Sequence, residues 1–78
     1  MDDWLAEKRR ALIQAVPEVE RAGLSDTEVD ELLDLARLAA HESGDRRNAP
    51  LLAYFVGFAH GADPSRSLAQ LVAELTRV

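Results

Sequence analysis

The chain contains no cysteine, which excludes disulfide bonds and thiolate metal sites. Its N-terminal residues Met1-Asp2-Asp3 are acidic, and no basic segment followed by an apolar run comes after them, so we expect no signal peptide. No apolar run approaches the roughly 18 residues that a membrane span requires, so we expect no contact with a membrane. These absences together predict a cytoplasmic protein.

Positive charge is also scarce. Nine lysines and arginines stand against fourteen aspartates and glutamates, which gives a formal net charge of −5. An acidic chain is repelled by phosphate backbones at long range. Two basic clusters, Lys8-Arg9-Arg10 and Arg46-Arg47, do not reverse the overall sign. We therefore expect no nucleic-acid partner.

The residue patterns of common catalytic and metal sites are missing as well. The two histidines, His41 and His60, have no carboxylates at a spacing known from zinc or iron sites. The sequence has no glycine-rich phosphate loop, and no serine stands in a nucleophile elbow. The sequence thus predicts a protein with no catalytic residues, no metal and no cofactor, and not an enzyme.

What the sequence does contain is a series of helix start and stop signals. With 78 residues the chain forms one domain, residues 1–78. No segment shows strand alternation. The signals predict an all-α fold, a compact bundle of four helices at approximately 3–16, 26–43, 49–61 and 64–77, with an extra turn near 18–22.

Each helix end is predicted from a specific residue. Asp3 is expected to cap the first helix, and Ser25-Asp26-Thr27-Glu28 is a capping box for the second. Gly44 should end the second helix in the left-handed conformation, and Gly61 should end the third. The third and fourth helices share one start signal, a cap residue followed by a first-turn proline, and we expect these caps at Asn48 and Asp63.

The apolar arc of the second helix is unusually wide, which indicates contact with more than one neighbour. The residues that share its main face are Val29, Leu32, Leu33, Ala36, Ala39 and Ala40. Leu35 and Leu38 widen this arc on one side.

The third helix has no formally charged residue between Ala49 and Gly61, so it is expected to be the most buried element. Ala53, Gly57 and Gly61 form a ridge of small residues along it. Glycine inside a helix costs about 1 kcal/mol relative to alanine, so Gly57 suggests close approach of another backbone. That backbone belongs either to the first or second helix of the same chain or to a second copy. Trp4 is read either as a lid over the core or as an exposed anchor for a partner.

One cluster suggests a ligand. Arg46 and Arg47 immediately precede the N-terminus of the third helix, and His41 lies near the end of the helix before it. Arginines beside free helix N–H groups form a candidate site for a phosphate or carboxylate. The alternative is a solvated basic loop that balances the charges of Glu42 and Asp45.

Several segments carry a resemblance to a known family. They are Asp2-Asp3-Trp4-Leu5, Leu32-Leu33-Asp34-Leu35-Ala36-Arg37, Ala40-His41, Ala49-Pro50-Leu51, Phe55-Val56-Gly57 and Ala59-x-Gly61. The chain resembles a family of short helical domains of unknown function from high-GC Gram-positive bacteria. Members of that family are free-standing, or are fused to or encoded beside the molybdenum cofactor guanylyltransferase. The resemblance implies an accessory or interaction domain near molybdenum cofactor assembly.

Three functions follow as hypotheses. The first is a non-catalytic accessory domain that binds a protein partner in molybdenum cofactor metabolism. The second is a binding module in which His41, Arg46 and Arg47 hold a phosphorylated pterin or a nucleotide. The third is a homodimeric scaffold that associates through the ridge of Ala53 and its two glycines.

Overall fold

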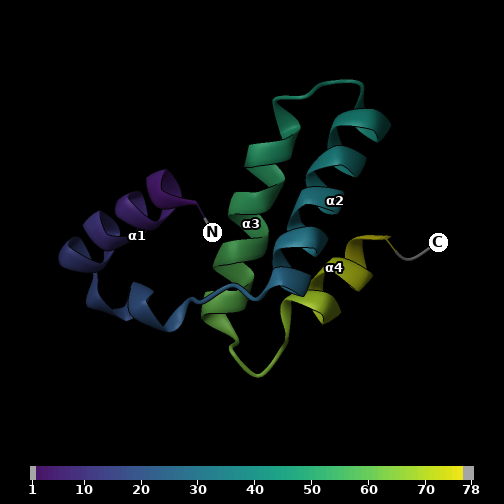
Figure 1. Ribbon diagram of the computed structural model, residues 1–78. Coiled ribbons are helices and arrows are strands. Elements are labelled where there is room, and N and C mark those ends of the chain that lie inside the picture. Colours follow the sequence, from purple (N-terminus) through teal and green to yellow (C-terminus); the bar gives the residue numbers. More distant parts are fainter. Residues whose placement is uncertain (1, 77–78) are drawn as a thin grey trace.

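The computed structural model describes residues 2–76 and contains four α-helices (Figure 1). They are α1 (Asp3–Ala15), α2 (Asp26–Ser43), α3 (Asn48–Ala62) and α4 (Leu68–Thr76). A short 3₁₀ helix, η1 (Pro17–Arg21), follows α1 and corresponds to the extra turn predicted near residues 18–22. No strand occurs in the part of the chain that the structure describes. The predicted all-α fold with four helices is confirmed.

Both ends of α2 agree with the prediction because local residues determine them. The Ser25 hydroxyl accepts a hydrogen bond from the Glu28 amide at 3.1 Å, and the Ser25 amide donates to the Glu28 carboxylate at 2.9 Å. At the other end Gly44 has a φ of 71°, a conformation that glycine adopts without steric cost.

The ends of α1 and α3 differ slightly from the prediction. Asp2 rather than Asp3 caps α1, and its carboxylate accepts from the Leu5 amide at 2.7 Å. Helix α3 begins at Asn48 itself, so Asn48 is not its cap, and it continues through Gly61 to Ala62. Gly61 therefore does not end the helix.

The predicted start of α4 is wrong. The Asp63 carboxylate accepts from the Ser65 amide and hydroxyl and from the Arg66 guanidinium, so it closes a turn and does not cap a helix. The helix begins later, after a capping box in which the Ser67 hydroxyl accepts from the Gln70 amide and the Ser67 amide donates to the Gln70 side chain. The predicted end at residue 77 lies outside the described residues.

The core lies between α2, α3 and α4, which contact one another (Figure 1). Each helix contributes one buried side chain, namely Leu35, Val56 and Leu68. The half-buried residues that surround them are Leu32, Leu52, Leu71 and Val72. A core with so few buried side chains provides only modest stability.

Helix α1 stands away from this core (Figure 1). Among the described elements it contacts η1, and it touches none of α2, α3 and α4. The Arg9 guanidinium joins the two short helices, because it donates to the carbonyls of Glu20 and Ala22 at 2.8 and 3.1 Å. We call residues 3–22 the arm. Gly23 and Leu24 connect the arm to the capping box of α2.

The position of the arm overturns two predictions of burial. Helix α3 is not the most buried element, because its outward side has no covering helix within the described chain. Trp4 is not a lid over the core, since it lies on the arm and 67% of its surface is exposed.

Candidate functional site

The outward side of α3 carries four large apolar side chains, which we call the α3 apolar face. They are Leu51, Tyr54, Phe55 and Phe58, and each is between 57% and 69% exposed. Their spacing of three and four residues places them along one side of the helix. The rings of Tyr54 and Phe55 meet edge to face, with centroids 5.9 Å apart. Contiguous exposed apolar patches often serve as interaction sites on folded proteins, so this face is the candidate site.

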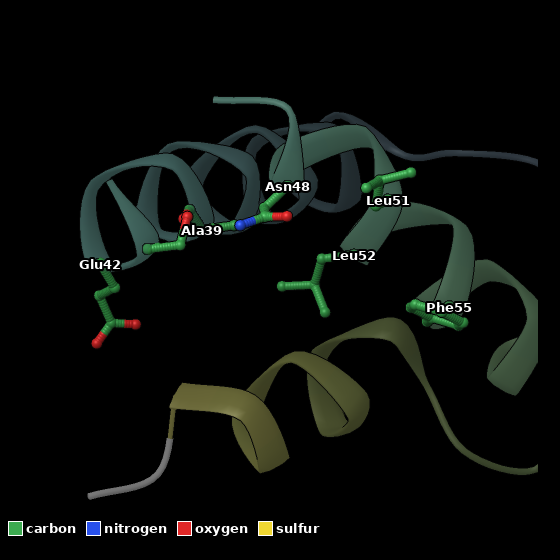
Figure 2. Close-up of a pocket in the computed structure, with 7 residues that line it drawn as sticks. Ala39, Glu42, Asn48, Leu51, Leu52 and Phe55 are labelled. Atoms are coloured by element: carbon green, nitrogen blue, oxygen red, sulfur yellow. The ribbon is translucent and has the colours of Figure 1, made fainter. Parts of the chain in front are cut away.

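Two shallow grooves run beside this face and share Leu52 and Phe55. The first groove, of about 380 Å³, lies between the end of α2 and the start of α3. Its lining residues are Ala39, Glu42, Ser43, Asn48, Leu51, Leu52 and Phe55 (Figure 2). The second groove, of about 180 Å³, lies between α3 and α4 and is lined by Leu52, Phe55, Val56, Ala59, Leu71, Glu74 and Leu75. Together the grooves extend the apolar surface around Phe55 towards α2 and towards α4.

The two glycines of α3 also lie on its exposed side. A Cβ atom added to Gly57 or Gly61 would meet no atom within 4 Å other than those of its chain neighbours and the nearby backbone of α3 itself. The prediction that Gly57 allows a close approach within the chain is therefore wrong. A seam between two copies stays a prediction. Ala53, the third residue of the predicted ridge, is half-buried.

The arm carries a second exposed apolar surface, which we call the α1 stripe. Its residues are Trp4, Leu5, Leu12 and Val16. The Lys8 ammonium lies 5.5 Å from the centroid of the Trp4 ring, a cation–π contact that covers part of the ring. The role of Trp4 as an anchor for a partner stays a prediction.

The structure brings together two of the three residues of the candidate anion site. His41 and Arg46 line one shallow hollow of about 400 Å³, together with Ala40 and Gly44. Arg47 does not line it, because its guanidinium binds the Asp45 carboxylate at 2.8 Å. The hydrogen bonds from the Arg47 side chain and amide lower the pKa of Asp45, and the same contact raises the pKa of Arg47.

Two further features concern metal binding and membrane spans in residues 2–76. Within this range no group of three or more histidine, aspartate or glutamate side chains is placed to hold a metal ion. No helix in the same range has the length and apolar character needed to cross a membrane.

Sequence reasoning missed Tyr54 and Phe58 as surface residues, because it expected α3 to be the most buried element. The signal that could have identified them is the absence of charge on every side of this helix. A helix that is packed on one side only normally carries charged residues on the other side.

Comparisons with known proteins give one match. The model of a family described as "Domain of unknown function (DUF6457)" matches residues 1–78. No curated protein and no solved structure matches the chain.

Proposed function

The chain belongs to the DUF6457 family, and from this premise we propose that it is a non-catalytic protein-interaction domain. The observation that carries the proposal is the α3 apolar face, with three aromatic rings and a leucine in solvent. Aromatic side chains are enriched in the cores of protein interfaces and supply much of their binding energy.

The shape and spacing of this face favour a helical partner segment. The exposed side chains follow the helix at positions i, i+3, i+4 and i+7, from Leu51 to Phe58, which is the pattern of a helix-docking surface. Grooves lie along the helix on the sides of α2 and α4. Gly57 and Gly61 have no side chains, so a docked helix can approach the backbone there. The partner segment would be an amphipathic helix with large apolar anchors.

We further propose that the partner belongs to molybdenum cofactor metabolism and that the protein acts in the cytoplasm. The support for this context is the family resemblance, which is densest between Leu32 and Gly61 and so includes the α3 apolar face. The molybdenum cofactor guanylyltransferase is the first partner to test.

A calorimetric titration of that guanylyltransferase with three forms of the domain tests the proposal. The forms are the natural chain, Leu51→Ser, and Leu33→Ser as a matched control. Leu51 and Leu33 are 57% and 58% exposed, but Leu33 lies on the outer side of α2, away from the grooves. Covering the exposed part of a leucine contributes about 1–2 kcal/mol, so Leu51→Ser should weaken binding by about fivefold to thirtyfold.

The outcomes separate the two parts of the proposal. Binding that Leu51→Ser and Leu33→Ser weaken equally would show that the α3 apolar face is not the docking surface. A natural chain that does not bind the guanylyltransferase would rule out this partner.

A second function, anion binding, is supported by the hollow that His41 and Arg46 share. Because Arg47 is held by Asp45, Arg46→Ala should abolish the binding of inorganic phosphate or a nucleotide, and Arg47→Ala should preserve it. An NMR titration with phosphate checks this. Equal binding by the natural chain and Arg46→Ala, or no binding by either, would remove the hypothesis.

A further inference from the structure

The chain exposes far more surface than a compact monomer of its mass. Its accessible surface is 6251 Å² for 8.6 kDa, whereas a folded monomer of this mass exposes about 4,700 Å². Its radius of gyration is 13.0 Å, against about 11.5 Å for a compact domain of the same length. The separation of the arm from α2, α3 and α4 accounts for the difference. About 1,500 Å² is therefore available to be covered.

Two exposed apolar faces of the same chain, the α1 stripe and the α3 apolar face, contribute to this surface. The α1 stripe and the α3 apolar face each lie on a helix of similar length, 13 and 15 residues. Each helix is therefore about 20 Å long. Neither face carries an acidic side chain, but two basic residues, Lys8 and Arg9, lie among the residues of the α1 stripe. The long stem of Lys8 can lie along apolar surface, and the Arg9 guanidinium is bound to the carbonyls of Glu20 and Ala22. The two faces thus match in length and polarity.

The connection between the arm and α2 favours a second copy as the source of the covering helix. Arg9 fixes α1 to the carbonyls of Glu20 and Ala22, so the arm is held as a unit down to Ala22. The capping box at Ser25 fixes the start of α2, which leaves Gly23 and Leu24 as the only residues between the two fixed parts. A short connection between two rigid elements favours exchange between copies over closure within one chain.

We infer that two copies of the chain exchange arms, so that the α1 stripe of each copy covers the α3 apolar face of the other. This inference rests on the proposed function, because it takes the α3 apolar face to be a helix-docking surface. In the dimer the exchanged arm occupies that face, so a helix of another protein binds there only by displacing the arm. Covering about 1,500 Å² on each chain gives an interface of about 3,000 Å², within the range of permanent homodimers. The contact also enlarges a core that has one buried side chain from each of three helices.

A cross-linking experiment tests the exchange directly. Because the natural chain has no cysteine, only the introduced cysteines can react with the cross-linker. Lys8→Cys and Tyr54→Cys are prepared as separate chains, mixed, and treated with a bismaleimide that spans the roughly 8–10 Å between packed helices. Both positions are near the middle of their helices, so they meet whichever way the helices run. We expect a cross-linked product of twice the chain mass, formed between the two variants. Leu33→Cys replaces Tyr54→Cys as the control and should give little product.

Other products would overturn the inference. A single-chain loop in the double variant Lys8→Cys/Tyr54→Cys, without product in the mixture, means that the arm closes on its own α3. Products between two Tyr54→Cys chains alone mean that α3 pairs with α3.

Light scattering over a range of concentrations gives an independent test. The natural chain should have twice the monomer mass, and Phe58→Asp should raise the dissociation constant of the dimer by about tenfold or more. Because Phe58 is 69% exposed, the variant should keep the helical circular dichroism of the natural chain. A natural chain that is monomeric at every concentration overturns the exchange. The guanylyltransferase titration still tests the α3 apolar face in that case, so the two failures are distinguishable.

Discussion

Two leucines on the same helix provide the sharpest test of the fold. Leu35 is 2% exposed at the centre of the core, and Leu33, two residues earlier on α2, is 58% exposed. Leucine-to-alanine substitution in a core costs about 2–5 kcal/mol, and the same change at an exposed position away from other features costs about 0.5 kcal/mol or less. A chain of this length with a small core has a total stability of only about 4–12 kcal/mol.

The two variants should therefore behave very differently on heating. For a domain of this size each kcal/mol shifts Tm by about 4–8 °C, so Leu35→Ala should lower Tm by at least about 8 °C or prevent folding. Leu33→Ala should shift Tm by no more than about 4 °C. Thermal and urea melts followed by circular dichroism, at equal chain concentration, measure both. Equal losses for the two variants, or a larger loss for Leu33→Ala, would refute the orientation of α2 described above.

Three further predictions concern helix ends and loop charges. Gly44→Ala should destabilise the chain by about 1 kcal/mol in a urea melt, because alanine adopts a φ of 71° only with strain; an unchanged midpoint would contradict this. The hydrogen bond from the Ser25 amide lowers the pKa of Glu28. The ionised Glu28 carboxylate therefore stabilises the fold above the unfolded pKa of about 4.3, and this stabilisation is lost as the pH falls through the pKa of the folded state. Melts from pH 7 to pH 3 should therefore show a smaller loss of stability for Glu28→Gln, and identical pH profiles would count against the capping box. Arg47→Ala should raise the pKa of the Asp45 carboxylate in an NMR titration, and an unchanged value would mean that the ion pair does not persist in solution.

The parts of the fold that could be predicted from the sequence depend on residues close together in the chain. The predictions of both ends of α2 are correct, because the Ser25–Glu28 capping box and Gly44 each act within one helical turn. The predicted start of α4 is wrong because the sequence holds two capping signals in succession, one at Asp63 and one at Ser67. Asp63 uses its carboxylate in a turn, and the reciprocal pair of Ser67 and Gln70 starts the helix instead.

The orientation of the helices could not be predicted in the same way. A helical wheel gives the apolar side of a helix, but it does not say whether a core or another molecule covers that side. The sequence placed Leu33 within the main apolar face of α2 and Leu35 beside it, whereas α3 and α4 enclose Leu35 and leave Leu33 exposed. The same limit applies to Arg47, because sequence spacing does not distinguish an anion ligand from the partner of Asp45.

Gly57 offers a prediction in which stability and binding change in opposite directions. A Cβ atom at this position meets no atom within 4 Å beyond its chain neighbours and the nearby backbone of α3, so Gly57→Ala should stabilise the folded monomer by up to about 1 kcal/mol through helix propensity. If a docked helix approaches the backbone of α3 at Gly57, the added methyl group should weaken that contact. The two effects are separated by measuring monomer stability in the Phe58→Asp background and association by light scattering of Gly57→Ala alone.

If Gly57 has no contact with another chain, the second measurement should give a different result. In that case Gly57→Ala would raise monomer stability and leave the dissociation constant of the dimer unchanged. A more stable monomer together with weaker association would show that the glycine is retained for contact with another chain. Destabilisation of the monomer would contradict the open surroundings of Gly57 and hence the exposed position of this side of α3.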